Sequence, residues 1–352
     1  MVALPVLGVF GSFWDLGAAA ETLRHLAATV IPNALFETAV LAAGVGIGVA
    51  TLGASTAWLV ATCDFPGRKG FEWALLLPLA MPGYIVAYAY TDYLQYAGPL
   101  QSALRAAFGW ERSDYWFPEI RSLPGAVFVF TVVLYPYAYL LARTAFLART
   151  AAMIDAARSL GLTPWQTWWR VNLPLARPAI AAGVLLALME TIADYGASAY
   201  FGLQTFTTSI YRAWFSLGDR TAASQLAAML LVLVLVLFYV EHRARGRARF
   251  FTPTASQRPA ARSPLRGRRA TGAFALCAAS VALGFAIPLV LLVRLLLPAW
   301  STLDWSRYGG WVMNTLFIGA AAASIVLGAV LALAYTARAV TQGKPAVLVR
   351  AA

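Results

Sequence analysis

Long blocks of apolar residues recur along this 352-residue chain, and they limit its fold more than any other feature. A helix needs roughly 20 predominantly apolar residues to cross the hydrocarbon core of a bilayer. Only 12% of the residues are charged, whereas a soluble domain usually carries about 25%. The sequence therefore predicts an all-α, polytopic membrane protein, with spans at 33–62, 72–95, 122–142, 178–200, 222–240, 272–297 and 312–335.

Lys and Arg are concentrated on one side of these spans. If 63–71, 143–177, 241–271 and 336–352 are cytoplasmic, these stretches hold 19 of the 27 basic residues. Such a bias marks the cytoplasmic loops of inner-membrane proteins. The net charge of +12 does not indicate a nucleic-acid-binding protein, because no aromatic residues alternate with the arginines. We expect a multi-pass protein of the bacterial inner membrane.

Nine arginines between Arg243 and Arg269 are mixed with Pro, Ser and Gly. This composition is typical of a flexible, solvated linker, although a polybasic stretch of this kind also attracts anionic lipid headgroups. An internal repeat flanks the stretch, since Asn33-Ala34-Leu35-Phe36 opens one span and Asn314-Thr315-Leu316-Phe317 opens another. Simple shared span composition is the other explanation for this similarity.

We accordingly divide the chain into a first transmembrane unit (1–240), a basic cytoplasmic linker (241–271) and the start of a second unit (272–352). Val2–Val9 is apolar but too short to span a bilayer. We expect it to be the outer end of a first helix whose beginning is missing.

The most informative stretch runs from Asp155 to Pro174, on the predicted cytoplasmic side. Gly161 is expected to end one short helix, and Thr163 to cap a second one that has Pro164 at its first position. That second helix is expected to end before Pro174. Its large apolar residues recur at helical spacing and need a surface to bury against; they are Trp165, Trp168, Trp169 and Val171.

The stretch resembles the EAA loop of ABC importer permeases, E-A-A-x3-G-x9-I-x-L-P, with Asp155 in place of Glu and Val171 in place of Ile. In that family the loop forms coupling helices that dock in a groove of the ATPase subunit. The resemblance implies this role here for Asp155, Ala156, Ala157, Gly161, Leu173 and Pro174. An amphipathic helix lying on the membrane surface is the alternative.

The resemblance covers nearly the whole chain and implies a type I importer permease (MetI-like) fold. The stretches most similar to the ferric-iron branch are 63–68, 77–84, 189–196 and 205–215. They imply transport of ferric iron delivered by a periplasmic binding protein, while thiamine, sulfate, phosphonate or polyamine stay open as substrates. Permeases of this branch usually fuse two six-helix units, each with an EAA loop. We expect one six-helix unit here and a second that stops after two helices.

No G-x-x-x-x-G-K-[ST] phosphate loop occurs in the sequence. ATP and Mg are therefore expected on a separate ATPase, which we take to be a dimer, and this chain is expected to bind no cofactor and not to be an enzyme. A secondary transporter driven by an ion gradient is the main rival, but it leaves the Asp155–Pro174 stretch unexplained. A membrane-embedded enzyme is a weaker rival, because no metal triad or Ser/His pair occurs within the spans.

Two carboxylates, Glu190 and Asp194, lie one helical turn apart within a predicted span. Ionisable groups in a membrane are costly and normally face a bundle interior or a wet path. Carboxylate oxygens suit a hard cation, so we expect these two as transient metal ligands, with Tyr195 and Glu37 also on the substrate path. Alternatively, the two carboxylates bond to neighbouring helices or hold a helix break near Gly196, and Glu37 is only interfacial.

Pro78, Pro82 and Gly83 fall inside the span predicted at 72–95. Proline removes a backbone donor and clashes with the preceding turn, so a kink or break is expected there. Broken helices often line transport paths, although a kink without function is equally common.

Overall fold

The computed structural model describes residue 9 and residues 16–148, 153, 156–157, 159–245 and 262–339. The chain divides into two compact units, Met1–Leu292 and Val293–Ala352. The described part is almost entirely helical; its strands β1 (Cys63–Asp64) and β2 (Ser263–Pro264) form one short parallel pair.

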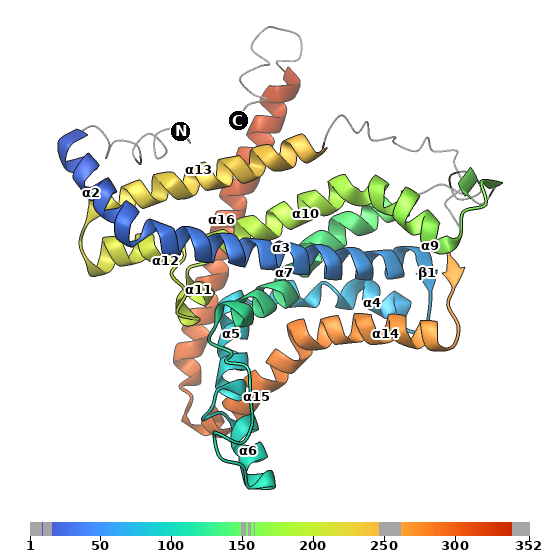
Figure 1. Cartoon of the computed structure of the whole chain (residues 1–352), viewed down its shortest axis with the longest axis horizontal. Coiled ribbons are helices and arrows are strands. Elements are labelled where there is room, and N and C mark those ends of the chain that lie inside the picture. The colour runs from blue at the N-terminus through green and yellow to red at the C-terminus, as the bar shows by residue number, and fades with distance from the viewer. Residues whose placement is uncertain are drawn as a thin grey trace. The chain divides into compact units, whose positions relative to one another are not determined.

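Three long helices form the centre of the first unit: α3 (Ile31–Thr62), α7 (Leu123–Leu147) and α10 (Leu173–Ala193). They run side by side (Figure 1), and small residues on their facing sides let the backbones approach closely. A Cβ added at Gly183 would lie 2.5 Å from the Ala138 Cα, and one at Gly53 would lie 2.7 Å from the Ala138 Cβ. The surrounding core is aliphatic and aromatic, with Leu41, Val45, Val49, Phe130 and Val133 all buried.

The second predicted span is broken, as its prolines indicated. It consists of α4 (Arg68–Ala74), a 3₁₀ turn η2 (Leu77–Ala80) and α5 (Gly83–Leu94), followed by α6 (Pro99–Phe108). The parts before and after the break, Arg68–Ala80 and Gly83–Phe108, are bent by 87° relative to each other. Pro82 directly precedes α5 with an extended backbone, so the helical hydrogen-bond ladder stops there and restarts.

A further group of helices follows α10: α11 (Gly196–Tyr200), α12 (Phe206–Tyr211), a π turn η4 (Arg212–Ser216) and α13 (Arg220–Arg245). They share a core with α2 (Leu16–Thr29), a helix that the sequence analysis did not predict, through Leu26, Phe206 and Leu226. Val2–Val9 lies outside the described residues apart from Val9.

The described part of the chain resumes at Arg262, next to the C-terminal end of α3. Strand β2 pairs with β1, and the Leu265 N–H donates to the Asp64 carbonyl at 2.9 Å. The next helical elements are α14 (Arg268–Val281), a π turn η5 (Ala282–Ala286) and α15 (Ile287–Ala299). The flexibility predicted up to Arg269 is therefore wrong for 262–269, because free backbone groups after α3 pair with this segment; 246–261 lie outside the described residues.

Helix α14 and the turn η5 pack against α4 and α5 within the first unit. Phe274 contacts Phe71 edge-to-face at 5.3 Å between ring centroids, and the Tyr90 hydroxyl donates to the Leu283 carbonyl at 2.6 Å. The division of the chain at 241–271 stays a prediction.

The second unit contains a 3₁₀ turn η6 (Trp300–Thr302) and helix α16 (Trp305–Ala339). Every side chain from Trp305 to Ala332 is exposed, although the helix is apolar enough to cross a membrane. Whether 33–62 and 312–335 are equivalent helices of two repeats also stays a prediction.

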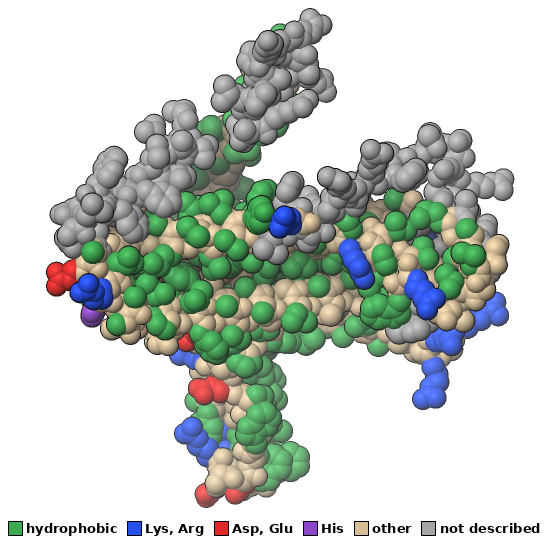
Figure 2. Space-filling view, turned by 45° about the horizontal axis from the view of Figure 1, so that its top comes forward, with side chains coloured by type: hydrophobic (Ala, Val, Ile, Leu, Met, Phe, Trp, Pro, Cys, Tyr) green, Lys and Arg blue, Asp and Glu red, His purple; other side chains and the backbone are tan. Residues whose placement is uncertain are grey.

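Within the described residues, six helices are long and apolar enough to span a membrane, and the bent pair makes up to seven. Each of the seven predicted spans thus has a counterpart. The bounds 178–200 were wrong, because helix α10 ends at Ala193 and the short α11 starts separately at Gly196. Figure 2 shows hydrophobic side chains along the long helices, with several Lys and Arg side chains near the end where β1 and α9 (Pro164–Thr167) lie.

Candidate functional site

The candidate ATPase-coupling segment begins with a helix end and a new helix start. Gly161 has a φ of +73°, a left-handed conformation that favours glycine and stops a helix. The Thr163 hydroxyl accepts from the Gln166 N–H at 3.3 Å, and the Gln166 side chain accepts from the Thr163 N–H at 2.9 Å. This reciprocal pair is a capping box, so the predicted start of the second helix is confirmed.

The predicted end of that helix before Pro174 was wrong. Helix α9 continues through a π turn, η3 (Trp168–Asn172), directly into α10. At the junction the Leu173 N–H donates to the Trp168 carbonyl, five residues back. The wider turn changes the hydrogen-bond register just before Pro174, which has no N–H to donate. Residues 164–193 are therefore one continuous helical rod.

Trp168 and Trp169, two neighbouring tryptophans of this segment, face in different directions. Trp168 packs inward, with its ring 4.9 Å from that of Trp58 on α3 and 5.5 Å from that of Phe146 on α7. Trp169 is half-exposed, and Leu160 beside Gly161 is 80% exposed. The segment is thus anchored to the C-terminal ends of α3 and α7 by one tryptophan, while other apolar side chains face outward.

The remaining predicted coupling residues include buried, half-buried and exposed side chains. Ala157 is buried, Ala156 and Gly161 are exposed, and Val171, Leu173 and Pro174 are half-buried. Asp155 and the side chain of Trp165 lie outside the described residues. Docking on an ATPase stays a prediction for all of them.

At the other end of α10, Asp194 stabilises the helix break. Its Oδ1 accepts from the Ala197 N–H at 2.7 Å, which caps the turn into α11. A Cβ added at Gly83 would lie 3.7 Å from Asp194 Oδ2, so this oxygen lies near the start of α5. The structural role considered for Asp194 is therefore present, and the carboxylate lies beside the break in the second span.

Glu190 has different surroundings. Its side chain is exposed, and among the described residues no hydrogen bond or ion pair involves its carboxylate. Tyr195 stacks on Tyr211 with 4.0 Å between ring centroids, and Tyr211 continues the contact to Phe215 at 5.5 Å. An exposed carboxylate and an aromatic cluster thus lie near the end of α10; their contact with substrate stays a prediction.

Glu37 connects α3 to the loop after α11. Its Oε2 accepts from the Gln204 N–H at 2.5 Å, and the neighbouring Thr38 hydroxyl accepts from the Phe206 N–H at 3.1 Å. The Thr207 hydroxyl in turn donates to the Ile192 carbonyl at 2.5 Å. These bonds fix α12 to α3 and to the end of α10, which gives Glu37 a structural contact that the sequence did not indicate.

Sequence reasoning also missed an ion-pair network near the C-terminal end of α3. Glu72 on α4 bonds to the buried Arg68, and its other oxygen lies 3.4 Å from Arg143 on α7. The Tyr139 hydroxyl donates to the Glu72 carbonyl at 3.1 Å. The i,i+4 spacing of Arg68 and Glu72 was the signal that could have indicated part of it. Among the described side chains, no three His, Cys, Asp or Glu residues gather as a metal site.

The described residues form an all-helical bundle with one broken span and six helices that are long and apolar enough to cross a membrane. Residues 53–244, more than half of the chain, match the family of binding-protein-dependent transport system inner membrane components. The chain belongs to this family. It is therefore a multi-pass inner-membrane protein and a transport component.

Similar proteins transport different solutes. The Fe(3+)-transport system permease protein FbpB 2 of Haemophilus influenzae is 25% identical over 213 residues, which cover 60% of this chain and 38% of that protein. The molybdenum transport system permease protein ModB of Escherichia coli (strain K12) is 28% identical over 188 residues, covering 51% of this chain and 78% of that protein. The chain thus spans well under half the length of the iron relative.

Among solved structures, a bacterial ABC transporter involved in the import of the acidic polysaccharide alginate contains a similar chain. The TM-score is 0.55 at 18% identity, with 69% of this chain and 89% of that chain covered. The likeness shows a shared fold.

Proposed function

We propose that this chain is the membrane-spanning permease subunit of an ATP-driven ABC importer. The observation that carries the proposal is the continuous rod 164–193. It starts at the capped segment that resembles the EAA loop, is anchored by Trp168, and ends at the Asp194 break. An uninterrupted helical element between a docking surface and a broken span can transmit a movement driven by ATP hydrolysis.

We expect two kinds of partner. An ATPase chain supplies ATP and Mg, and its groove receives the segment around Gly161. A periplasmic binding protein delivers the substrate on the opposite side. In support, the alginate transporter with a similar fold was solved in complex with a periplasmic protein, with a TM-score of 0.54.

Ferric iron is the proposed substrate. Its support is the similarity to FbpB 2 and the exposed Glu190 carboxylate in the last turn of α10, because carboxylate oxygens suit a hard cation. The competing candidate is an oxyanion, since the molybdenum permease ModB is similar at 28% identity. Uptake of radioactive iron or molybdate by reconstituted transporter decides between them.

A substitution at Gly161 tests the coupling role. A Cβ added there meets nothing of this chain within 4 Å, so within the permease Gly161→Val strains only the left-handed backbone, at a cost of about 1–2 kcal/mol. We expect transport to be uncoupled from ATP hydrolysis while the protein still accumulates in the membrane. Gly218 has a φ of +67° and equally open surroundings, so Gly218→Val is the matched control. Normal transport by the Gly161 variant would show the docking assignment to be wrong.

A further inference from the structure

The loop between α5 and α7 is unusually basic for its side of the membrane. Arg105, Arg112 and Arg121 are three of only eight basic residues outside the stretches predicted to be cytoplasmic. Short outer loops normally carry few Lys and Arg. A cluster of arginines there therefore needs a reason other than topology.

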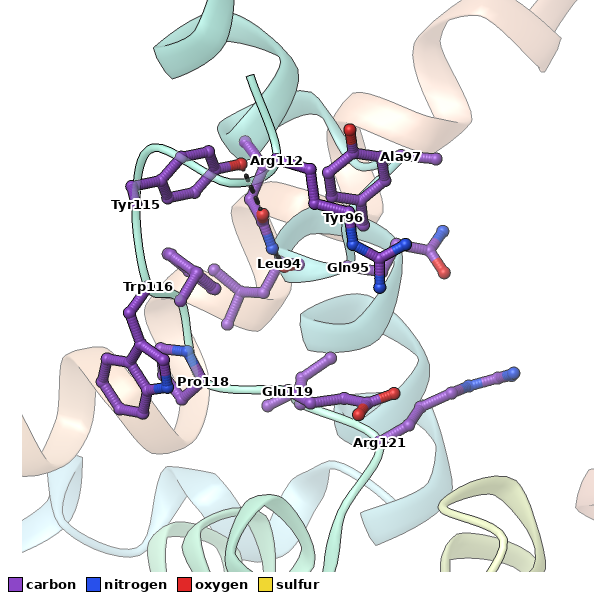
Figure 3. A pocket seen from close by; sticks show the side chains of 13 residues that line it. Leu94, Gln95, Tyr96, Ala97, Arg112, Tyr115, Trp116, Pro118, Glu119 and Arg121 are labelled. Atoms are coloured by element: carbon purple, nitrogen blue, oxygen red, sulfur yellow. Dashed lines mark hydrogen bonds between the residues drawn. The ribbon is translucent and has the colours of Figure 1, made fainter. Parts of the chain in front are cut away.

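Two of these arginines, Arg112 and Arg121, line a cavity of about 490 Å³. Figure 3 shows Tyr96 and Arg112 at one end of it, and Glu119 and Arg121 at the other. The cavity is lined by Leu94, Gln95, Tyr96, Ala97, Gln101, Arg112, Tyr115, Trp116, Phe117, Pro118, Glu119, Ile120 and Arg121. Its size suits one side chain or a short loop tip from a partner.

The loop is held in shape by its own hydrogen bonds. The buried Gln101 side chain donates to the Leu94 carbonyl at 2.7 Å and accepts from the Tyr115 hydroxyl at 2.8 Å. That hydroxyl also accepts from Arg105 at 3.0 Å. Trp110 stacks on Tyr115 at 5.5 Å. A cavity formed in advance in this way loses little entropy when it is filled.

The arginines are stacked on tyrosine rings. The Arg105 and Arg112 guanidinium carbons lie 4.1 and 5.0 Å from the centroid of the Tyr96 ring, and that of Arg121 lies 4.8 Å from the Tyr200 ring. Within the described residues, no carboxylate lies within ion-pair distance of any of the three. Stacking on a ring face leaves the N–H groups at the guanidinium edge for bidentate bonds to a carboxylate.

Two further features favour a protein as the source of that carboxylate. Arg105 and Arg112 approach the same ring, so an arriving negative charge relieves their mutual repulsion. Trp116 lines the same cavity and is 86% exposed. An exposed tryptophan beside arginines is typical of the residues that dominate protein–protein binding energy.

We propose that this cavity is a docking site for an acidic side chain of the periplasmic binding protein. The inference rests on the proposed function, because it needs such a partner. Arg112 and Arg121 act as carboxylate receptors, and Trp116 packs against the partner beside them. Glu119, the one acidic residue that lines the cavity, favours a single carboxylate over a strongly acidic segment.

The test uses the assembled transporter in nanodiscs and the binding protein that stimulates its ATPase. Stimulation by the wild-type transporter is measured first, and its absence would count against the proposed function alone. With stimulation established, Arg112→Gln combined with Arg121→Gln should raise the Kd for the binding protein about tenfold or more and reduce its dependence on salt. Thermal unfolding of the variant confirms that it is folded.

Arg307→Gln is the matched control, because Arg307 also stacks on an aromatic ring, 5.3 Å from the Trp311 centroid, but lies outside the cavity. We expect its Kd to be unchanged, and Arg112→Lys to retain part of the affinity. An unchanged Kd in the double variant would overturn the proposal. It would equally be overturned if calorimetry showed sodium molybdate or sulfate binding to the permease alone and the double variant abolished that binding.

Discussion

Replacing Trp168 with alanine tests whether the coupling segment is anchored as the structure indicates. Truncating a fully packed tryptophan to alanine lowers the free energy of unfolding by about 3–5 kcal/mol. Trp168 is only partly buried, but it makes ring contacts with Trp58 at 4.9 Å and with Phe146 at 5.5 Å. Aromatic pairs each contribute about 0.5–1.5 kcal/mol to stability. We therefore expect Trp168→Ala to lower the free energy of unfolding by about 2 kcal/mol.

In a domain of 150–250 residues, about 2 kcal/mol corresponds to a fall in Tm of roughly 4–8 °C. The measurement is thermal unfolding of the purified permease in detergent. The second readout is ATPase activity of the assembled transporter, in which the loosened segment should lower stimulation by the loaded binding protein. The two effects should appear together, because the same contacts hold the segment to α3 and α7.

Trp169→Ala is the control, since Trp169 is the next residue and is half-exposed. Its loss should change stability by about 0.5 kcal/mol or less but should weaken retention of the ATPase during purification. The opposite result, with Trp169→Ala lowering Tm and Trp168→Ala leaving it unchanged, would refute the assignment of inward and outward faces.

Three further predictions address the rest of the first unit. Glu190→Gln combined with Asp194→Asn should reduce uptake without reducing ATPase docking, and unchanged iron uptake would rule out a required role in the path. Gly183→Ala should lower stability by about 1–3 kcal/mol through overpacking, whereas Gly46→Ala, where the new Cβ meets side chains at 3.6 Å, should change Tm little. Glu72→Gln should lower stability by less than the about 3–5 kcal/mol expected for an unpaired buried charge, because buried Arg68 loses its closer carboxylate but keeps Asp64 at 3.6 Å; an unchanged Tm in thermal unfolding would show that the network is dispensable.

The features that the sequence predicted correctly depend on local chemistry. Membrane spans follow from the length of an apolar stretch alone, whatever tertiary contacts the stretch makes. The turn at Gly161, the cap at Thr163 and the break at Pro82 each depend on one residue and its immediate neighbours, and the structure contains all three.

The failures share a different cause. The continuation past Pro174 depends on a π turn, whose register follows from how the whole helix packs. The inward direction of Trp168 depends on Trp58, which is more than 100 residues away in sequence. The outer cavity depends on Gln101 and Tyr115, whose side chains look like ordinary loop residues until the fold brings them together. Spacing along the chain carries none of this information.

The continuity of the rod has a mechanical consequence for the proposed importer. Residues 164–193 form 30 residues of helix, which at 1.5 Å per residue is about 45 Å, longer than the hydrocarbon core of about 30 Å. A tilt of about 5° at the end anchored by Trp168 would displace the far end by about 4 Å. That end is bonded to α12 through Thr207 and to α11 through Asp194. A helix that ended before Pro174 would absorb such a movement at the joint, whereas this one delivers it to the break in the second span.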